Sequence, residues 1–218
     1  MYSGVFDLDG TVIDLFDLHL AGFQSIVKKD YGLEFTRGDL EATYGKTGEE
    51  IARIFFEKKG VEGVPIHEFA ERRRQWVIDN MVDIHVIKGV RELLDGLLEE
   101  DFTLGVATSN TRNIGEAIIE ASGLSDLFSA SAFRDPSIRG KPAPDIFLMA
   151  ANLLGADPAD CVAFEDSIFG VQAAKTAGMK VVGTATGTHT YDELLREEPD
   201  RLVHDLTEIS VEDVLGLL

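Results

Sequence analysis

Cysteine is almost absent from this sequence, and that scarcity limits what the protein can be. Cys161 is the only cysteine among 218 residues, so no disulfide can form within the chain. A reducing cytoplasm is therefore the expected setting. The residues after it, Val162 to Phe164, are apolar, so Cys161 is predicted to be a small core residue in a buried strand.

Basic charge and long apolar runs are also scarce. The chain has 20 Lys and Arg against 39 Asp and Glu, a net charge of −19, which argues against binding to nucleic acid or to anionic membrane surfaces. No stretch of about 18 uncharged residues exists to span a bilayer. The residues before Asp7 are too few for a signal peptide. We expect a cytoplasmic monomer or weak homodimer.

Hydrophobic residues make up 44% of the chain, enough for a sizeable core. Short apolar runs alternate with helical patterns, which predicts an α/β fold with a Rossmann-like parallel sheet. The predicted strands lie at 5–6, 104–107, 129–133, 161–164 and 180–182, and helical patterns lie at 114–121 and 168–177. Residues 203–218 are expected to add a short strand and a terminal helix.

About 90 residues separate the first two predicted strands, far more than one crossover needs. Amphipathic helices are predicted there at 15–29, 48–58 and 66–81, and no convincing strand. This predicts two domains. Residues 1–14 and 85–218 would form the sheet core, and residues 15–84 an inserted all-α helical cap.

Polar residues follow several strands, where parallel sheets bind ligands. Asp7 and Asp9 follow the first strand, and residues two apart on extended backbone point to the same side. Two carboxylates so close repel unless a cation relieves them. With Asp166 they form a hard oxygen site suited to Mg²⁺. The alternative is a β-hairpin, because Asp9-Gly10 is a strong turn signal.

Thr108, Ser109 and Asn110 follow the second strand and precede a predicted helix. Backbone amides at a helix N-terminus, with hydroxyl and amide side chains, can hold an anion. The alternative is ordinary helix capping by Asn110 or Thr111.

Lys141 and Glu165-Asp166 follow two further strands. Lys141 precedes Pro142, which favours extended backbone in a rigid loop that can fix a positive charge. The alternatives are a solvated loop lysine and an acidic helix start. Each of these alternatives could explain its own segment. An ordinary structural explanation of the whole pattern would require all of them to hold at once, so the pattern favours a functional site.

In combination, these segments closely resemble the motifs of the haloacid dehalogenase (HAD) superfamily of phosphotransferases. The matching segments are Asp7-Leu8-Asp9-Gly10-Thr11, Thr108 after an apolar strand, Lys141 in Gly-Lys-Pro-Ala-Pro-Asp, and Glu165-Asp166. The resemblance covers essentially the whole chain, including the helical insert. Within the superfamily, the chain looks most like the group of phosphoglycolate phosphatases and β-phosphoglucomutases.

The resemblance implies a role for each motif residue. Asp7 would attack phosphorus and become an aspartyl phosphate, and Asp9 would act as general acid and then general base. Thr108 and Lys141 would hold the phosphoryl oxygens. Mg²⁺ would be bound by the Asp7 side chain, the Asp9 backbone carbonyl and Asp166, with Glu165 nearby.

The expected function is Mg²⁺-dependent hydrolysis of a small phosphorylated metabolite, similar to phosphoglycolate or a sugar phosphate. Candidate substrate-binding residues are His19, Lys46, Ser109 and Asn110. A phosphosugar mutase is the alternative, but mutases of this group carry a cap arginine where this chain has Gly48. Arg72-Arg73-Arg74 is expected to be a solvated helix face. A non-catalytic metabolite-binding or phosphoacceptor module is a more remote alternative.

Overall fold

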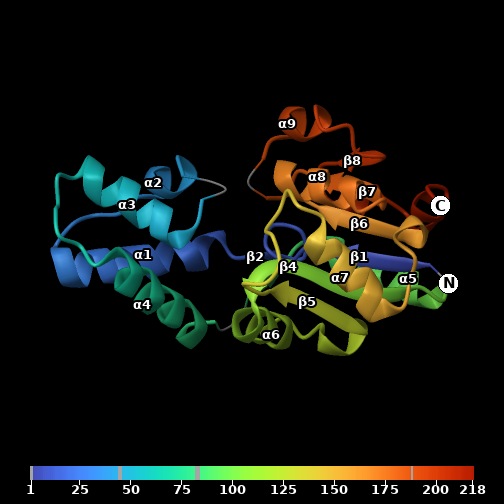
Figure 1. The fold of residues 1–218 in the computed structure, drawn as a ribbon, viewed down its shortest axis with the longest axis horizontal. Coiled ribbons are helices and arrows are strands. Elements are labelled where there is room, and N and C mark those ends of the chain that lie inside the picture. Colours follow the sequence, from blue (N-terminus) through green and yellow to red (C-terminus); the bar gives the residue numbers. More distant parts are fainter. Residues whose placement is uncertain (1, 44–45, 82–83, 188) are drawn as a thin grey trace. The chain divides into compact units, whose positions relative to one another are not determined.

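The computed structural model describes residues 2–43, 46–81, 84–187 and 189–218, and the chain divides into two compact units (Figure 1). The sheet unit consists of Met1–Asp14 and Asp83–Leu218, and the helical unit of Leu15–Val82. Each unit has its own apolar core.

Within the described residues, a sheet of six parallel strands forms the centre of the sheet unit, in the order β5-β4-β1-β6-β7-β8. The strands are β1 (Ser3–Phe6), β4 (Thr103–Thr111), β5 (Ala130–Arg134), β6 (Cys161–Glu165), β7 (Lys180–Thr184) and β8 (Arg201–Val203). The predicted α/β fold is confirmed. The hairpin alternative at Asp9-Gly10 is wrong, because both neighbours of β1 run parallel to it.

Both faces of the sheet are buried, as a parallel sheet requires. Val5 of β1 belongs to a core cluster that includes Phe147 and Val171. The next residue, Phe6, points to the opposite face and stacks on Phe164, with ring centroids 4.2 Å apart. The helices of this unit are α5 (Val90–Glu99), α6 (Arg112–Ala121), α7 (Asp145–Leu154), α8 (Ile168–Thr176), α9 (Tyr191–Leu195) and α10 (Val211–Leu215).

Strand β4 runs further than the apolar pattern predicts. It continues through Thr111, which pairs with Arg134 of β5 after a register shift beyond Ala107. Helix α6 starts directly after the strand, at Arg112, with Thr111 as its N-cap residue. Thr108, Ser109 and Asn110 therefore lie between the apolar part of β4 and a helix, as predicted, although they belong to the strand.

The helical unit contains α1 (Phe16–Tyr31), α2 (Arg37–Glu41), α3 (Gly48–Lys58) and α4 (Ile66–Asp79). Its core is aromatic: Phe23, Phe35, Phe56 and Phe69 are each at most 2% exposed. Helix α2 was not predicted from the apolar pattern. It begins with a capping box in which Thr36 and Asp39 bond each other's backbone amides.

Two short strands lie where no strand was predicted. β2 (Ile13–Asp14) pairs antiparallel with β3 (His85–Val86). Each strand has only two residues, too few to give an alternating pattern.

Cys161 is fully buried in the core of the sheet unit, as predicted. The helices in the described part of the chain are all too short or too polar to cross a membrane.

Candidate active site

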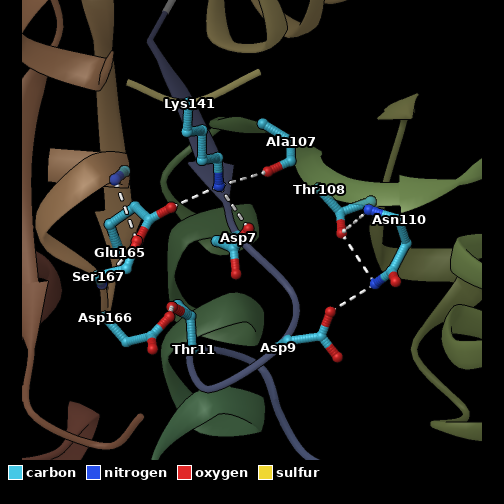
Figure 2. A network of polar contacts seen from close by, with 11 residues as sticks. Asp7, Asp9, Thr11, Ala107, Thr108, Asn110, Lys141, Glu165, Asp166 and Ser167 are labelled. Atoms are coloured by element: carbon cyan, nitrogen blue, oxygen red, sulfur yellow. Dashed lines mark hydrogen bonds and ion pairs between the residues drawn. The ribbon is translucent and has the colours of Figure 1, made fainter. Parts of the chain in front are cut away.

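Side chains from three adjacent strands meet at the carboxyl edge of the sheet (Figure 2). Asp7 directly follows β1, and its backbone amide donates to the Phe164 carbonyl of β6 at 3.0 Å. Thr108 lies in β4 and Glu165 is the last residue of β6. Because β1 lies between β4 and β6, the three side chains reach the same edge.

Lys141 joins the carboxylates of two strands. Its Nζ atom donates to Asp7 Oδ1 at 2.6 Å, to Glu165 Oε1 at 2.5 Å and to the Ala107 carbonyl at 3.3 Å. The side chain is 9% exposed, so a solvated loop lysine is excluded. Burial alone would lower the pKa of Lys141, but the charges of Asp7 and Glu165 outweigh it and raise the pKa.

Asp7 is held by Lys141 through one carboxylate oxygen only (Figure 2). Burial raises the pKa of Asp7 to about 8, although Lys141 acts in the opposite direction. The negative charges of Glu165 and Asp9 also contribute to the increase. Asp7 therefore needs additional positive charge if it is to be ionised at neutral pH.

Glu165 is fully buried. Besides Lys141, it accepts hydrogen bonds from the Ser167 backbone amide at 2.8 Å and the Ser167 hydroxyl at 2.9 Å. Ser167 also caps α8, accepting from the Gly170 amide at 3.0 Å. A Cβ atom at Gly170 would overlap the Glu165 carboxylate. Ser167 and Gly170 thus fix Glu165. Ser167 follows a predicted strand end, but no role was predicted for either residue.

Asp166 is 3% exposed and lies in a narrow space beside the turn after β1. Thr11 Oγ1 donates to Asp166 Oδ1 at 3.1 Å. A Cβ atom at Gly10 or Gly187 would overlap the Asp166 carboxylate. The hydroxyl of Thr186 donates to the Gly10 carbonyl at 2.5 Å and braces this turn. Gly187 was not predicted, because no local sequence pattern indicates its role.

Asp9 lies on the other side of Asp7 and contacts Asn110 (Figure 2). Asn110 Nδ2 donates to Asp9 Oδ2 at 2.5 Å. The same amide group and the Asn110 backbone amide each donate to Thr108 Oγ1 at 3.1 Å. Ser109 is exposed. The structure therefore brings together Asp7, Asp9, Thr108, Asn110, Lys141, Glu165 and Asp166 of the predicted site.

Residues 5–184 match the family model described as haloacid dehalogenase-like hydrolase. The chain belongs to this family. It is 31% identical over 185 residues to the Escherichia coli fructose-1-phosphate phosphatase YqaB, covering 83% of this chain and 95% of that protein. It is 32% identical over 194 residues to the Bacillus subtilis β-phosphoglucomutase, covering 86% and 84%.

Solved structures of this family have the same fold as this hydrolase. A putative β-phosphoglucomutase from Thermotoga maritima superimposes with a TM-score of 0.83 and 26% identity, covering all of both chains. The protein CbbY from Rhodobacter sphaeroides in complex with phosphate gives a TM-score of 0.80 and 25% identity, covering 95% of this chain and 96% of that one. This member of the family is a phosphoric monoester hydrolase.

The buried carboxylates of this hydrolase have the donor chemistry that a hard divalent cation requires. Burial, reinforced by the charges of Glu165 and Asp7, raises the pKa of Asp166 well above its usual range. A cation between Asp166 and Asp7 would relieve both carboxylates. Among the described residues no three His, Cys, Asp or Glu side chains form a metal-binding group. The predicted Mg²⁺ ligands are two carboxylates, those of Asp7 and Asp166, and the backbone carbonyl of Asp9, so they do not require three such side chains.

The predicted substrate-binding residues of the helical unit have different surroundings. His19 is half-buried, and its Nδ1 atom accepts a hydrogen bond from Arg73 Nη2 at 2.5 Å. Burial and the Arg73 charge lower the pKa of His19 to about 3, so the imidazole is neutral. Lys46 is exposed. Tyr44 and Gly45, the two residues before Lys46, lie outside the described residues.

Arg72, Arg73 and Arg74 were predicted to lie on a solvated helix face, and this prediction is wrong for Arg73. Its guanidinium lies 4.9 Å from the centroid of the Phe23 ring, and a Cβ atom at Gly48 would approach Arg73 Nη1 to 3.4 Å. Arg72 forms a salt bridge with Asp30 at 2.6 Å. The helix positions alone did not indicate that Arg73 would turn toward His19.

Proposed function

We propose that this hydrolase is a Mg²⁺-dependent phosphatase that acts on a small phosphorylated metabolite through an aspartyl phosphate on Asp7. The observation that supports this most is the position of Asp7. One of its oxygens accepts from the buried Lys141 ammonium, and Asp9 lies on the opposite side (Figure 2). A carboxylate oriented by a buried cation is suited to nucleophilic attack.

In the first half of the proposed reaction, an Asp7 oxygen forms a bond to phosphorus as the ester bond breaks. Asp9 gives its proton to the leaving oxygen, which keeps the electron pair of the broken bond. Lys141 faces the phosphoryl group with its positive charge. Thr108 Oγ1 already accepts two hydrogen bonds from Asn110, so its own proton is available for a phosphoryl oxygen.

In the second half, Asp9 takes a proton from water, and the water oxygen attacks the phosphorus of the aspartyl phosphate. This breaks the bond to Asp7 and releases phosphate. Bound Mg²⁺, held by Asp7, Asp166 and the Asp9 carbonyl, would neutralise charge on the phosphoryl oxygens. Glu165 holds Lys141 in place through its 2.5 Å contact, so we assign it a supporting role beside the metal.

The proposed substrate is a phosphorylated sugar or a similarly small phosphorylated acid. Two relatives are named after their substrates: the fructose-1-phosphate phosphatase, and a validoxylamine A 7'-phosphate phosphatase from Streptomyces hygroscopicus that is 29% identical over 211 residues. We assign substrate selection to His19, Lys46 and Ser109. The neutral His19 imidazole suits a sugar hydroxyl better than a second anion.

A panel of phosphorylated two- and three-carbon acids and sugars, assayed for phosphate release, tests the proposed function. We expect turnover of at least one member in Mg²⁺, its loss in EDTA, and its return when Mg²⁺ is added in excess. A protein that releases no phosphate from any member and retains no phosphoryl group would support a binding module. Retention of a stable phosphoryl group would support a phosphoacceptor.

Substitution of Gly187 by alanine tests the assignment of Asp166 to the metal. The new Cβ atom would overlap the Asp166 carboxylate and displace it. We expect the Mg²⁺ concentration for half-maximal activity to rise by about 10- to 100-fold. Gly38→Ala is the matched control, because its Cβ atom would meet only Thr36 Oγ1 at 3.9 Å. An unchanged Mg²⁺ requirement in Gly187→Ala would argue against Asp166 as a ligand.

A phosphosugar mutase is the second candidate, and one observation favours it. The sequence offers no arginine at Gly48, but the Arg73 guanidinium lies beside that glycine. An arginine there could hold a second phosphate group. Interconversion of glucose 1-phosphate and glucose 6-phosphate without net phosphate release would favour the mutase.

We further propose that the protein is cytoplasmic, is a monomer or weak homodimer, and binds no nucleic acid or membrane.

A further inference from the structure

Asn110 occupies a central position that the proposed reaction leaves without a role. It comes from the extension of β4, and Asp9 from the turn after β1, 101 positions earlier in the chain. The pair Thr111–Arg134 follows a register shift after Ala107, so Asn110 lies in the irregular last part of β4. From there its side chain reaches Asp9.

The hydrogen bonds of Asn110 use its whole amide nitrogen. One bond goes to Asp9 Oδ2 at 2.5 Å and one to Thr108 Oγ1 at 3.1 Å. An amide nitrogen carries two hydrogens, so both are used within the protein. The carboxylate acceptor requires the nitrogen, not the carbonyl oxygen, to face Asp9. Asn110 was expected to bind substrate, but its nitrogen already holds two side chains of the active site.

The contact with Asn110 distinguishes the two oxygens of Asp9. Oδ2 accepts the hydrogen bond from Asn110 Nδ2, whereas Oδ1 is buried. Fixing one oxygen stops rotation of the carboxyl group, and orientation of this kind contributes strongly to proton transfer.

We propose that Asn110 is a positioning residue that holds Asp9 by Oδ2 and so orients the Asp9 carboxyl group for proton transfer to the leaving oxygen. This inference rests on the proposed function. When the ester bond breaks, the electron pair stays on the leaving oxygen, Asp7 forms the new bond to phosphorus, and the proton of Asp9 moves to the leaving oxygen. Asn110 touches neither the phosphorus nor the leaving group.

The test compares two kinds of ester in wild type and Asn110→Ala. One ester is p-nitrophenyl phosphate, whose leaving group departs without a proton. The other is the alkyl phosphate of the panel with the highest kcat/KM. Because kcat/KM reports only steps up to phosphoryl transfer, hydrolysis of the intermediate does not affect it. We expect kcat/KM for the alkyl ester to fall by about 10- to 100-fold and for p-nitrophenyl phosphate by less than about 3-fold.

Asn110→Asp separates hydrogen bonding from packing. Its side chain has the same shape, but it presents an oxygen instead of the NH₂ group to Asp9. We expect the ratio of alkyl to aryl kcat/KM to fall further in Asn110→Asp than in Asn110→Ala. Asn113→Ala is the matched control for Asn110→Ala. Asn113 is exposed, and its carboxamide oxygen accepts a hydrogen bond from the Thr111 hydroxyl. This variant should leave kcat/KM unchanged for both esters.

Three results would overturn the positioning role: equal loss for both esters, no loss for either, or Asn110→Asp retaining a higher ratio than Asn110→Ala. Equal loss is what a structural role or direct substrate binding would give. Failure of the proposed function looks different, because the wild-type protein itself would then hydrolyse neither ester.

Discussion

Replacement of Asp7 by asparagine is expected to lower the rate of phosphate release by about 10⁴-fold or more, the scale of losing a covalent nucleophile. The amide has nearly the shape of the carboxylate but cannot form an aspartyl phosphate under these conditions. Asp7 lies at the end of β1 with Lys141 Nζ at 2.6 Å. Initial rates with the best substrate of the panel would measure the loss.

The Asp7→Asn protein should be fully folded, which makes its inactivity interpretable. Burial raises the pKa of Asp7 from 3.8 to about 8, so the folded metal-free protein binds this proton more tightly than the unfolded chain. Wild-type stability should therefore decline as pH rises from about 4 to 8 in EDTA, and Asp7→Asn lacks this contribution. We expect the Tm of the variant relative to wild type to increase over that range. A variant that unfolds at every pH would remove this support.

Substitution of Lys141 by methionine is expected to have the second largest effect, on activity and stability together. Lys141 is the cation that contacts both Asp7 and Glu165. Its removal leaves the fully buried Glu165 carboxylate without its partner ammonium. Breaking a buried pair in this way costs about 3–5 kcal/mol. Denaturant unfolding should show this loss, and phosphate release should fall by about 100-fold or more, since one electrostatic stabiliser is worth that much.

A second substitution separates the two effects of Lys141. Glu165→Gln in the Lys141→Met background removes the unpaired charge, so stability should largely recover while activity stays low. Lys180→Met is the matched control, because Lys180 forms an exposed salt bridge with Asp200 at 3.1 Å and should lose less than about 1 kcal/mol. If the double variant regained activity, Lys141 would not act on the phosphoryl group.

Much of the fold could be predicted because its strands are buried on both faces. Apolar runs such as Cys161–Phe164 are read directly as strands, and the order of the motifs follows the order of the strand ends. The end of β4 could not be predicted, because pairing with β5 extends it through the polar residues up to Thr111. Helices α2 and α9 are too short for an amphipathic pattern, but the capping boxes at Thr36 and Thr190 could have indicated them.

The candidate site was predictable where one residue carries the chemistry by itself. A charged residue that follows a predicted strand indicates a ligand-binding site, and this applies to Asp7, Lys141 and Asp166. The roles of Gly187 and Ser167 could not be predicted, because these residues act only through contacts with Asp166 and Glu165. The role of Asn110 depends on a contact across 101 residues. Such a contact forms only when folding brings the ends of β1 and β4 together, so the sequence alone does not indicate it.

Trapping the intermediate tests the central claim most directly. Wild-type protein with Mg²⁺ would be mixed with a ³²P-labelled substrate, quenched in acid within the first turnover, and digested for peptide mapping. The account predicts label on the peptide containing Asp7, its disappearance when unlabelled substrate is added before the quench, and no label in Asp7→Asn. Label on another residue, or steady phosphate release by Asp7→Asn at the wild-type rate, would contradict it.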